Sequence, residues 1–193
     1  MSRYILGVTG ASGAIYATRT AMHLKSLGHF VCGLLTAPGR DVVCYEGENA
    51  LLDYCDEIQD VNNLFAECSS GSADYSGMAV VPCSMGTLGR IAHGTSDNLL
   101  VRSADVCLKE RRPLVMVPRE MPYNLIHLEN MEKVTRAGAV VIAASPQFYS
   151  RPTSMEELVD TVVVKVLKHL GIPQEQLARI VPPWQDKSST PLH

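Results

Sequence analysis

Two short segments rich in glycine and hydroxyl side chains could bind a phosphorylated ligand. Residues 9–13 have the sequence TGASG, and residues 84–87 have the sequence SMGT. Each follows a short apolar stretch and leads into a helix, so each would present free backbone N–H groups at a helix N-terminus, where anions bind. Two such loops on one parallel sheet predict a site for a ligand with a phosphate and a polar ring, such as a nucleotide or a flavin.

The TGASG segment also opens many nicotinamide-dependent short-chain reductases, but two features argue against that class. An NAD site needs an acidic residue roughly 20 residues beyond the glycines, and residues 36–40 have the sequence TAPGR instead. These reductases also need a lysine four residues after a tyrosine, and none of the seven tyrosines has one. Thr36 offers a hydroxyl to a ribityl or phosphate oxygen, with a helix cap as the alternative role, and Arg40 could pair with an anion.

Alternating strands and helices must position these loops. The expected strands cover residues 5–8, 30–35, 78–81, 114–117 and 140–143. The expected helices cover residues 14–27, 40–54, 98–111, 124–137 and 154–170, while residues 68–72 are a turn-rich stretch without a core signal. Near-continuous apolar strands predict a parallel sheet that is covered on both faces. The fold class is therefore α/β, a single Rossmann-like (flavodoxin-like) domain that binds ligands beyond the carboxyl ends of its strands.

Composition and charge argue against several other classes of protein. The 193 residues, 46% of them apolar, suffice for one domain with a sizeable core. No run approaches the roughly 18 apolar residues of a membrane span, and the start lacks the apolar core of a signal peptide. The net charge of −3 makes a nucleic-acid partner unexpected. The six cysteines show no C-x-x-C spacing, so we expect a reducing cytoplasm and neither a zinc site nor a redox dithiol.

Longer segments, in order and at family spacing, resemble the UbiX-type flavin prenyltransferases. The most specific block joins DNLL at residues 97–100 to KERR at residues 109–112. The other matching segments are residues 7–16, 69–72, 82–88, 91–96, 102–108, 118–122 and 148–152, followed by Trp184. The chain is therefore identified as a member of this group of flavin-binding, decarboxylase-like proteins.

The resemblance implies an enzyme that transfers a dimethylallyl group from dimethylallyl phosphate to N5 and C6 of reduced FMN without a metal. The prenylated flavin then serves decarboxylases of the UbiD type. The residues that the resemblance assigns to FMN are Gly10, Ala11, Ser12, Thr36, Ser84, Met85, Gly86, Thr87 and Arg119. Those that it assigns to the dimethylallyl donor are Tyr149, Lys165, Lys109 and Arg119. Those that it places at the reaction centre are Glu120, Glu46, Ser12, Lys109 and Trp184.

These residue types suit the chemistry. Breaking an allylic C–O bond without a metal requires cations and hydroxyls around the leaving phosphate, because charge-assisted contacts stabilise it strongly. Glu120 would act as an acid towards the departing phosphate and later as a base for ring closure. Two positions depart from the family pattern, which usually has Ser in place of Thr36 and often Arg in place of Lys165. The lysine keeps the charge but loses the bidentate fork of arginine.

Two alternatives remain beside the prenyltransferase. One is an FMN-dependent cysteine decarboxylase of the same superfamily, whose motifs differ from those at residues 82–87 and 118–122. The other is a non-catalytic subunit that carries flavin for a decarboxylase. The resemblance also implies a homo-oligomer between a trimer and a dodecamer, a flavoprotein domain over residues 1–181 and a C-terminal tail over residues 182–193. A monophosphate and a diphosphate donor are both compatible with the sequence.

Overall fold

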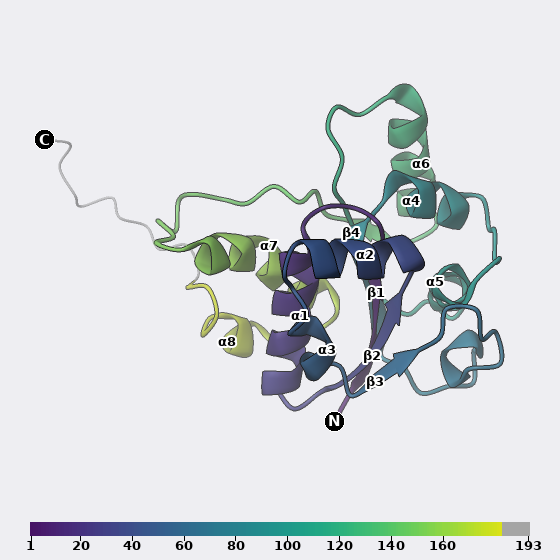
Figure 1. The fold of residues 1–193 in the computed structure, drawn as a ribbon, viewed down its shortest axis with the longest axis horizontal. Helices are drawn as coiled ribbons and strands as arrows, with labels where there is room; N and C mark the ends of the chain where they lie inside the picture. The colour runs from purple at the N-terminus through teal and green to yellow at the C-terminus, as the bar shows by residue number, and fades with distance from the viewer. Residues whose placement is uncertain (183–193) are drawn as a thin grey trace, which may run out of the picture.

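The computed structural model describes residues 1–182, and within them six parallel strands form one sheet in the order β3-β2-β1-β4-β5-β6 (Figure 1). The strands are β1 (Arg3–Val8), β2 (Phe30–Leu35), β3 (Glu57–Gln59), β4 (Gly77–Cys83), β5 (Leu114–Pro118) and β6 (Val140–Val141). The chain first adds strands on one side of β1 and then, from β4 onwards, on the other side. This is the doubly wound order of Rossmann-like domains, so the predicted fold class is confirmed.

Helices cover both faces of this sheet, as Figure 1 shows. The helices whose side chains join the core on one face are α1 (Ala14–Ser26), α2 (Ala37–Tyr45), α3 (Leu51–Tyr54), α7 (Met155–His169) and α8 (Gln174–Leu177). Those on the other face are η1 (Glu67–Ser69), α4 (Met85–Ala92), α5 (Leu99–Lys109) and α6 (Leu125–Arg136). No helix within residues 1–182 combines the length and apolar character that a membrane crossing requires.

The two faces explain why the central strands are largely apolar. In β1, Leu6 and Val8 join the core beneath α1 and α7, while Ile5 joins the core beneath α4 and α5. Successive side chains of a strand point to opposite faces, so a sheet that is covered twice needs apolar residues at every position. Gly7 is the exception within the buried part of this strand, because a Cβ there would lie 3.1 Å from Leu100 Cδ1 and would crowd α5.

The predicted helix over residues 40–54 is wrong. Helix α2 begins earlier, at Ala37, because the Thr36 side chain accepts a hydrogen bond from the Gly39 N–H at 3.1 Å and caps the helix. It ends at Tyr45, and Gly47 follows with a φ of 77°, a left-handed conformation that a helix cannot continue through. The expectation of no core signal at residues 68–72 is also wrong at one position, since Cys68 is buried on η1.

A buried ion cluster joins α1 to α7. Asp160, only 4% exposed, accepts a hydrogen bond from Arg19 Nε at 2.9 Å, and its second carboxylate oxygen pairs with Arg19 Nη2. His23 Nε2 lies 3.1 Å from Asp160 Oδ1. Burial on its own would raise the pKa of Asp160, but the hydrogen bonds from Arg19 and His23 outweigh burial and keep the pKa below its ordinary value. The cluster therefore stabilises the packing of α7, which carries Lys165.

Replacing Asp160 by Asn should lower the free energy of unfolding at pH 7 by about 3 kcal/mol, because Arg19 loses its counter-charge in a mostly buried place. A carboxylate with a depressed pKa stabilises the fold above its unfolded pKa and loses that contribution as the pH falls through its folded pKa. The difference between wild type and D160N in urea unfolding should therefore shrink below about pH 4. A difference that stays constant down to that pH would contradict the argument.

A matched control comes from the exposed pair of Glu132 with Arg136 on α6, whose side chains are 61% and 79% exposed. Replacing Glu132 by Gln removes the same kind of charge from a solvated pair. Its effect on the free energy of unfolding should stay below about 0.5 kcal/mol at all pH values.

Candidate active site

The loops after β1 and β4 meet where the strand order reverses. Thr9 Oγ1 donates a hydrogen bond to the Pro82 carbonyl at 2.9 Å and accepts one from the Ser84 N–H at 2.7 Å. The Thr9 N–H also donates to the Pro82 carbonyl, at 3.3 Å. The two segments that the sequence singled out therefore lie side by side at the carboxyl ends of neighbouring strands, the place where doubly wound sheets bind ligands.

The first loop packs tightly against the start of α2. A Cβ at Gly10 would lie 2.5 Å from Pro38 Cβ, and one at Gly39 would lie 2.4 Å from the Val8 carbonyl oxygen. Both positions therefore require glycine, because the backbone segments approach too closely for any side chain. Thr36 lies beside them as the cap of α2, so its alternative structural role is realised, and its contact with FMN stays a prediction.

The second loop opens helix α4. Ser84 is the N-cap residue: its hydroxyl accepts a hydrogen bond from the Thr87 N–H at 3.3 Å and donates to Thr87 Oγ1 at 3.1 Å. Met85 and Thr87 are buried, whereas Gly86 is exposed and a Cβ there would meet no atom within 4 Å. Open space therefore borders the first turn of α4, whose N–H groups have no intrahelical partner and favour an anion.

Glu46 occupies the N-terminus of α1. Its carboxylate accepts hydrogen bonds from the Ala14 N–H at 2.7 Å and from the Gly13 N–H at 3.0 Å. Gly13 is the N-cap residue of α1 and has no side chain to offer, so Glu46, from the end of α2, supplies the missing cap. The structure thus brings Glu46 next to Ser12, the residue that precedes Gly13.

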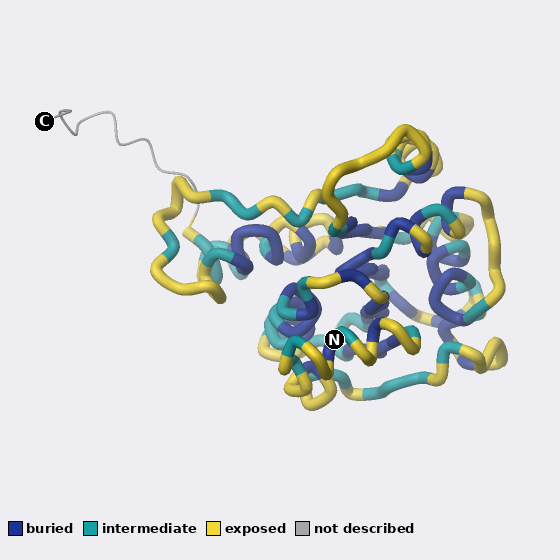
Figure 2. Tube along the Cα trace, turned by 45° about the horizontal axis from the view of Figure 1, so that its top comes forward, coloured by how far each residue is buried: buried dark blue, intermediate teal, exposed yellow. Residues whose placement is uncertain are grey.

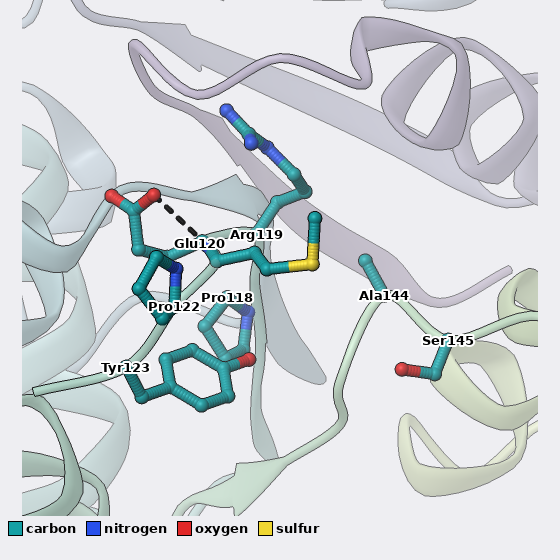
Figure 3. A pocket seen from close by; sticks show the side chains of 8 residues that line it. Pro118, Arg119, Glu120, Pro122, Tyr123, Ala144 and Ser145 are labelled. Carbon is teal, nitrogen blue, oxygen red and sulfur yellow. Dashed lines mark hydrogen bonds between the residues drawn. The ribbon is translucent and has the colours of Figure 1, made fainter.

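A hollow of about 380 Å³ opens beside this site at the carboxyl end of β5 (Figure 3). Arg119 connects the hollow to the loop after β1, because its Nε donates a hydrogen bond to the Ser12 carbonyl at 3.2 Å. Glu120 Oε1 accepts from the Met121 N–H at 3.0 Å. The residues that line the hollow are Pro118, Arg119, Glu120, Met121, Pro122, Tyr123, Ala144 and Ser145. It therefore combines one cation and one carboxylate with a largely apolar wall.

Lys109 lies where the strands begin, on the side of the sheet opposite the candidate site at their carboxyl ends. It ends α5, which runs back from the carboxyl ends of the strands, and it pairs with Glu110. Its Nζ lies close to Gly71, 2.6 Å from where a Cβ of that residue would be. The Gly71 carbonyl also accepts a hydrogen bond, at 2.6 Å, from Arg112, which lies just before the start of β5. Within one chain, the structure does not bring Lys109 to Ser12, Ser84 or Arg119.

The remaining predicted residues belong to the C-terminal third of the chain. Tyr149, 51% exposed, lies in the connection from β6 to α7, and the same connection contributes Ser145 to the hollow. The Gln147 N–H donates to the buried Thr161 Oγ1 at 3.1 Å, which ties this connection to α7. Lys165 is exposed on α7. Trp184 lies outside the described residues.

Thr9 is the residue of this site that the sequence analysis did not single out. The available signal was a hydroxyl residue placed directly after a buried strand. Cys83, next to Ser84, has no comparable role, because complete burial raises the pKa of its thiol to about 12 and leaves it unreactive. Among residues 1–182 there is no group of three or more His, Cys, Asp or Glu side chains that could hold a metal ion.

Comparisons with known proteins show which proteins the chain is similar to. A family model described as Flavoprotein matches residues 1–167. The flavin prenyltransferase UbiX of Methanothermobacter thermautotrophicus is 42% identical over 178 residues, which cover 91% of this chain and 93% of that protein. The flavin prenyltransferase UbiX of Pseudomonas aeruginosa is 42% identical over 194 residues, which cover 92% and 93%.

Solved structures extend the similarity to the fold. A crystal structure of AnUbiX (PadA1) in complex with FMN and dimethylallyl pyrophosphate matches with a TM-score of 0.90 and 36% identity, covering 96% of this chain and 98% of that one. A dodecameric FMN-dependent UbiX-like decarboxylase from Escherichia coli O157:H7 matches with a TM-score of 0.88 and 34% identity, covering 95% and 100%. The peptidyl-cysteine decarboxylase EpiD shares the fold alone, with a TM-score of 0.57 and 20% identity over 76% of this chain and 83% of that one.

Proposed function

Since the chain belongs to the Flavoprotein family, as a flavin prenyltransferase of the UbiX type, we propose that the crevice between β1 and β4 binds its FMN. The enzyme transfers a dimethylallyl group from dimethylallyl phosphate to N5 and C6 of reduced FMN. The observation that carries the proposal is the pairing of the two hydroxyl-lined loops through Thr9, beside the open N-terminus of α4.

The assignment of FMN to this crevice follows from the available partners. Its phosphate would lie at the N-terminus of α4, where Ser84 and Thr87 add hydroxyls, because the N-terminus of α1 already has the Glu46 carboxylate as a partner. Gly10, Ala11 and Ser12 would border the ring on one side and Arg119 on another. Thr36, Met85 and Gly86 complete the proposed set. Reduced FMN supplies the nucleophilic ring atoms, and the protein supplies orientation and proton control.

The hollow next to Arg119 fits the dimethylallyl donor. Its wall of Pro118, Met121 and Pro122 suits a five-carbon apolar chain, while Arg119 would face the phosphate and Glu120 would protonate it as it leaves. Tyr149 and Lys165 would add a hydroxyl and a second cation. Ser12 and Glu46 would manage the proton near N5, and the proposed aromatic neighbour of the allylic group is Trp184.

Lys109 can join this site only from a second copy of the chain, because in its own chain it lies where the strands begin, away from their carboxyl ends. The stretch around the hollow offers a surface for such a copy: Met121, Leu125 and Ile126 are 86%, 68% and 65% exposed. Figure 2 shows this stretch as a yellow band leading into α6. The dodecameric assembly of the related Escherichia coli protein supports contact between copies of the chain.

Three further assignments concern the recipient of the product, the setting of the enzyme and the bounds of its domain. The prenylated flavin would pass to a decarboxylase of the UbiD type. The enzyme would act in the cytoplasm, a setting that six unpaired cysteines suit. The flavoprotein domain would cover residues 1–181 and a tail residues 182–193.

The decisive test is incubation of the purified protein with reduced FMN and dimethylallyl phosphate, followed by mass spectrometry of the flavin. A mass gain of one prenyl group is the expected result, and a parallel reaction with the diphosphate identifies the preferred donor. Decarboxylation of a peptidyl cysteine would favour the cysteine decarboxylase instead. Bound but unchanged FMN with either donor would indicate a flavin carrier.

A further inference from the structure

We propose that Thr9 is a positioning residue that sets the geometry of the FMN site by fastening the loop after β4 to the loop after β1. The inference rests on the assignment of FMN to this crevice. It concerns a side chain with no assigned role in binding or in chemistry, which acts through Ser84 and the start of α4.

The need for such a residue arises where the β1–β4 ladder ends. The two strands pair from Tyr4 opposite Gly77 to Gly7 opposite Val80. Two residues later, Pro82 has no N–H and cannot donate to a neighbouring strand. On its other side, β4 also shifts register against β5 between Val80 and Cys83. One further backbone bond, from the Thr9 N–H to the Pro82 carbonyl at 3.3 Å, joins the two strands, and beyond it the backbone ladder stops just before the loop that must be placed most accurately.

Thr9 restores the connection with its side chain. Its hydroxyl makes two hydrogen bonds to the neighbouring strand: it donates to the Pro82 carbonyl at 2.9 Å and accepts from the Ser84 N–H at 2.7 Å. The residue is only 1% exposed, so water cannot replace either bond without local opening. Thr9 is thus a polar link between two strands at the level where their regular hydrogen bonds end.

Thr9 holds both of the loops that are proposed to bind FMN. Because the Ser84 N–H is fixed, the position of the Ser84 hydroxyl is fixed, and that hydroxyl holds the N–H and Oγ1 of Thr87. On the other loop, the Ala11 N–H donates to the Thr9 carbonyl at 2.8 Å, which bends the chain towards Ser12. Removal of the Thr9 hydroxyl should therefore displace Ser84 and Thr87 relative to the first loop, and both residues belong to the proposed flavin contacts.

The test compares FMN affinity with stability in three variants. Thr9→Val keeps the side-chain shape but removes the hydroxyl, and it should weaken FMN binding about tenfold, because the Ser84 N–H is left without an acceptor. Thr9→Ser keeps the hydroxyl and should bind FMN with nearly wild-type affinity. Thr20→Val is the matched control: Thr20 is fully buried in α1, and its hydroxyl donates within that helix to the Tyr16 carbonyl, at 2.7 Å, so the same exchange of hydroxyl for methyl should leave FMN affinity unchanged.

Affinity is read from quenching of FMN fluorescence without donor, so the outcome is independent of whether the protein prenylates flavin. Wild-type affinity in Thr9→Val would overturn the inference, and so would equal losses in Thr9→Val and Thr20→Val. If Thr9→Val does not fold, Thr9→Cys provides the same test with a weak donor in place of the hydroxyl. That variant should bind FMN several-fold more weakly than Thr9→Ser, and equal affinities would again overturn the inference.

Discussion

Replacing Glu120 by Gln should lower kcat at least about a hundredfold, because the amide keeps the shape of the side chain but can neither give nor take the proton. Glu120 lies in the hollow that fits the dimethylallyl donor, and among residues 1–182 its carboxylate accepts a hydrogen bond only from the neighbouring Met121 N–H. FMN affinity should not change, since the proposed flavin contacts lie on Arg119 and the two loops. Single-turnover formation of prenylated FMN, followed by mass spectrometry, measures the rate directly.

Glu129→Gln is the matched control for that experiment. Glu129 is an exposed residue of α6, and its replacement removes the same charge from the same side of the molecule. The control should keep the wild-type rate. If E120Q keeps most of its activity, Glu120 is not the acid of this reaction. A loss of FMN binding equal to the loss of rate would instead make it a structural residue.

Lys109→Ala should lower kcat/KM for the dimethylallyl donor by about a hundredfold or more, the scale expected when one donor to a developing anion is removed. Within one chain, Lys109 lies where the strands begin, whereas the hollow lies at the carboxyl end of β5. The loss of activity would therefore come from the missing Lys109 of a neighbouring copy. Lys168→Ala, another exposed lysine near the end of a helix, is the control and should keep wild-type kinetics.

Mixed oligomers separate a contribution from the neighbouring copy from an indirect effect. Oligomers that combine K109A chains with E120Q chains contain some sites with an intact Glu120 from one chain and an intact Lys109 from the other. These oligomers should regain activity that neither parent has. A mixture as inactive as its parents would show that Lys109 does not reach the site from a second copy.

Much of the fold was predictable because local patterns and tertiary packing agree. The second strand has the predicted bounds, and the helices that begin after Asn98, Asn124 and Ser154 start within one residue of the predicted positions. At each of these starts a side-chain oxygen accepts the N–H three residues later, a local interaction that the sequence displays directly.

The elements that were missed owe their existence to contacts far away in the sequence. Strand β3 has three residues and α8 has four, too few for a periodic pattern, and such short helices are stable only through tertiary packing. Helix α4 was expected only as the helix start after residues 84–87 and received no predicted bounds, because Gly86 and Gly89 dilute its apolar face. Residues 40–54 carried a helical pattern, and the conformation of Gly47 interrupted it.

The candidate site shows the same division. Its place at the carboxyl ends of β1 and β4 followed from the alternation of strands and helices. Two hydrogen bonds could not be predicted: the one from the Ser84 N–H to Thr9 Oγ1 and the one from the Ala14 N–H to the Glu46 carboxylate. They join residues that are 75 and 32 positions apart in the sequence. The distance of Lys109 from the other cations was equally hidden, since a sequence match does not distinguish one copy of a chain from its neighbour.

The Glu46 carboxylate has a consequence for which coenzymes this fold admits. In dinucleotide-binding relatives of the Rossmann type, the pyrophosphate bridge rests where the first helix begins. Here a resident negative charge already neutralises that dipole, with an oxygen 2.7 Å from the Ala14 nitrogen. A bridging diphosphate would meet repulsion instead of attraction, so the architecture selects mononucleotides by electrostatic exclusion before any contact with the ring is made.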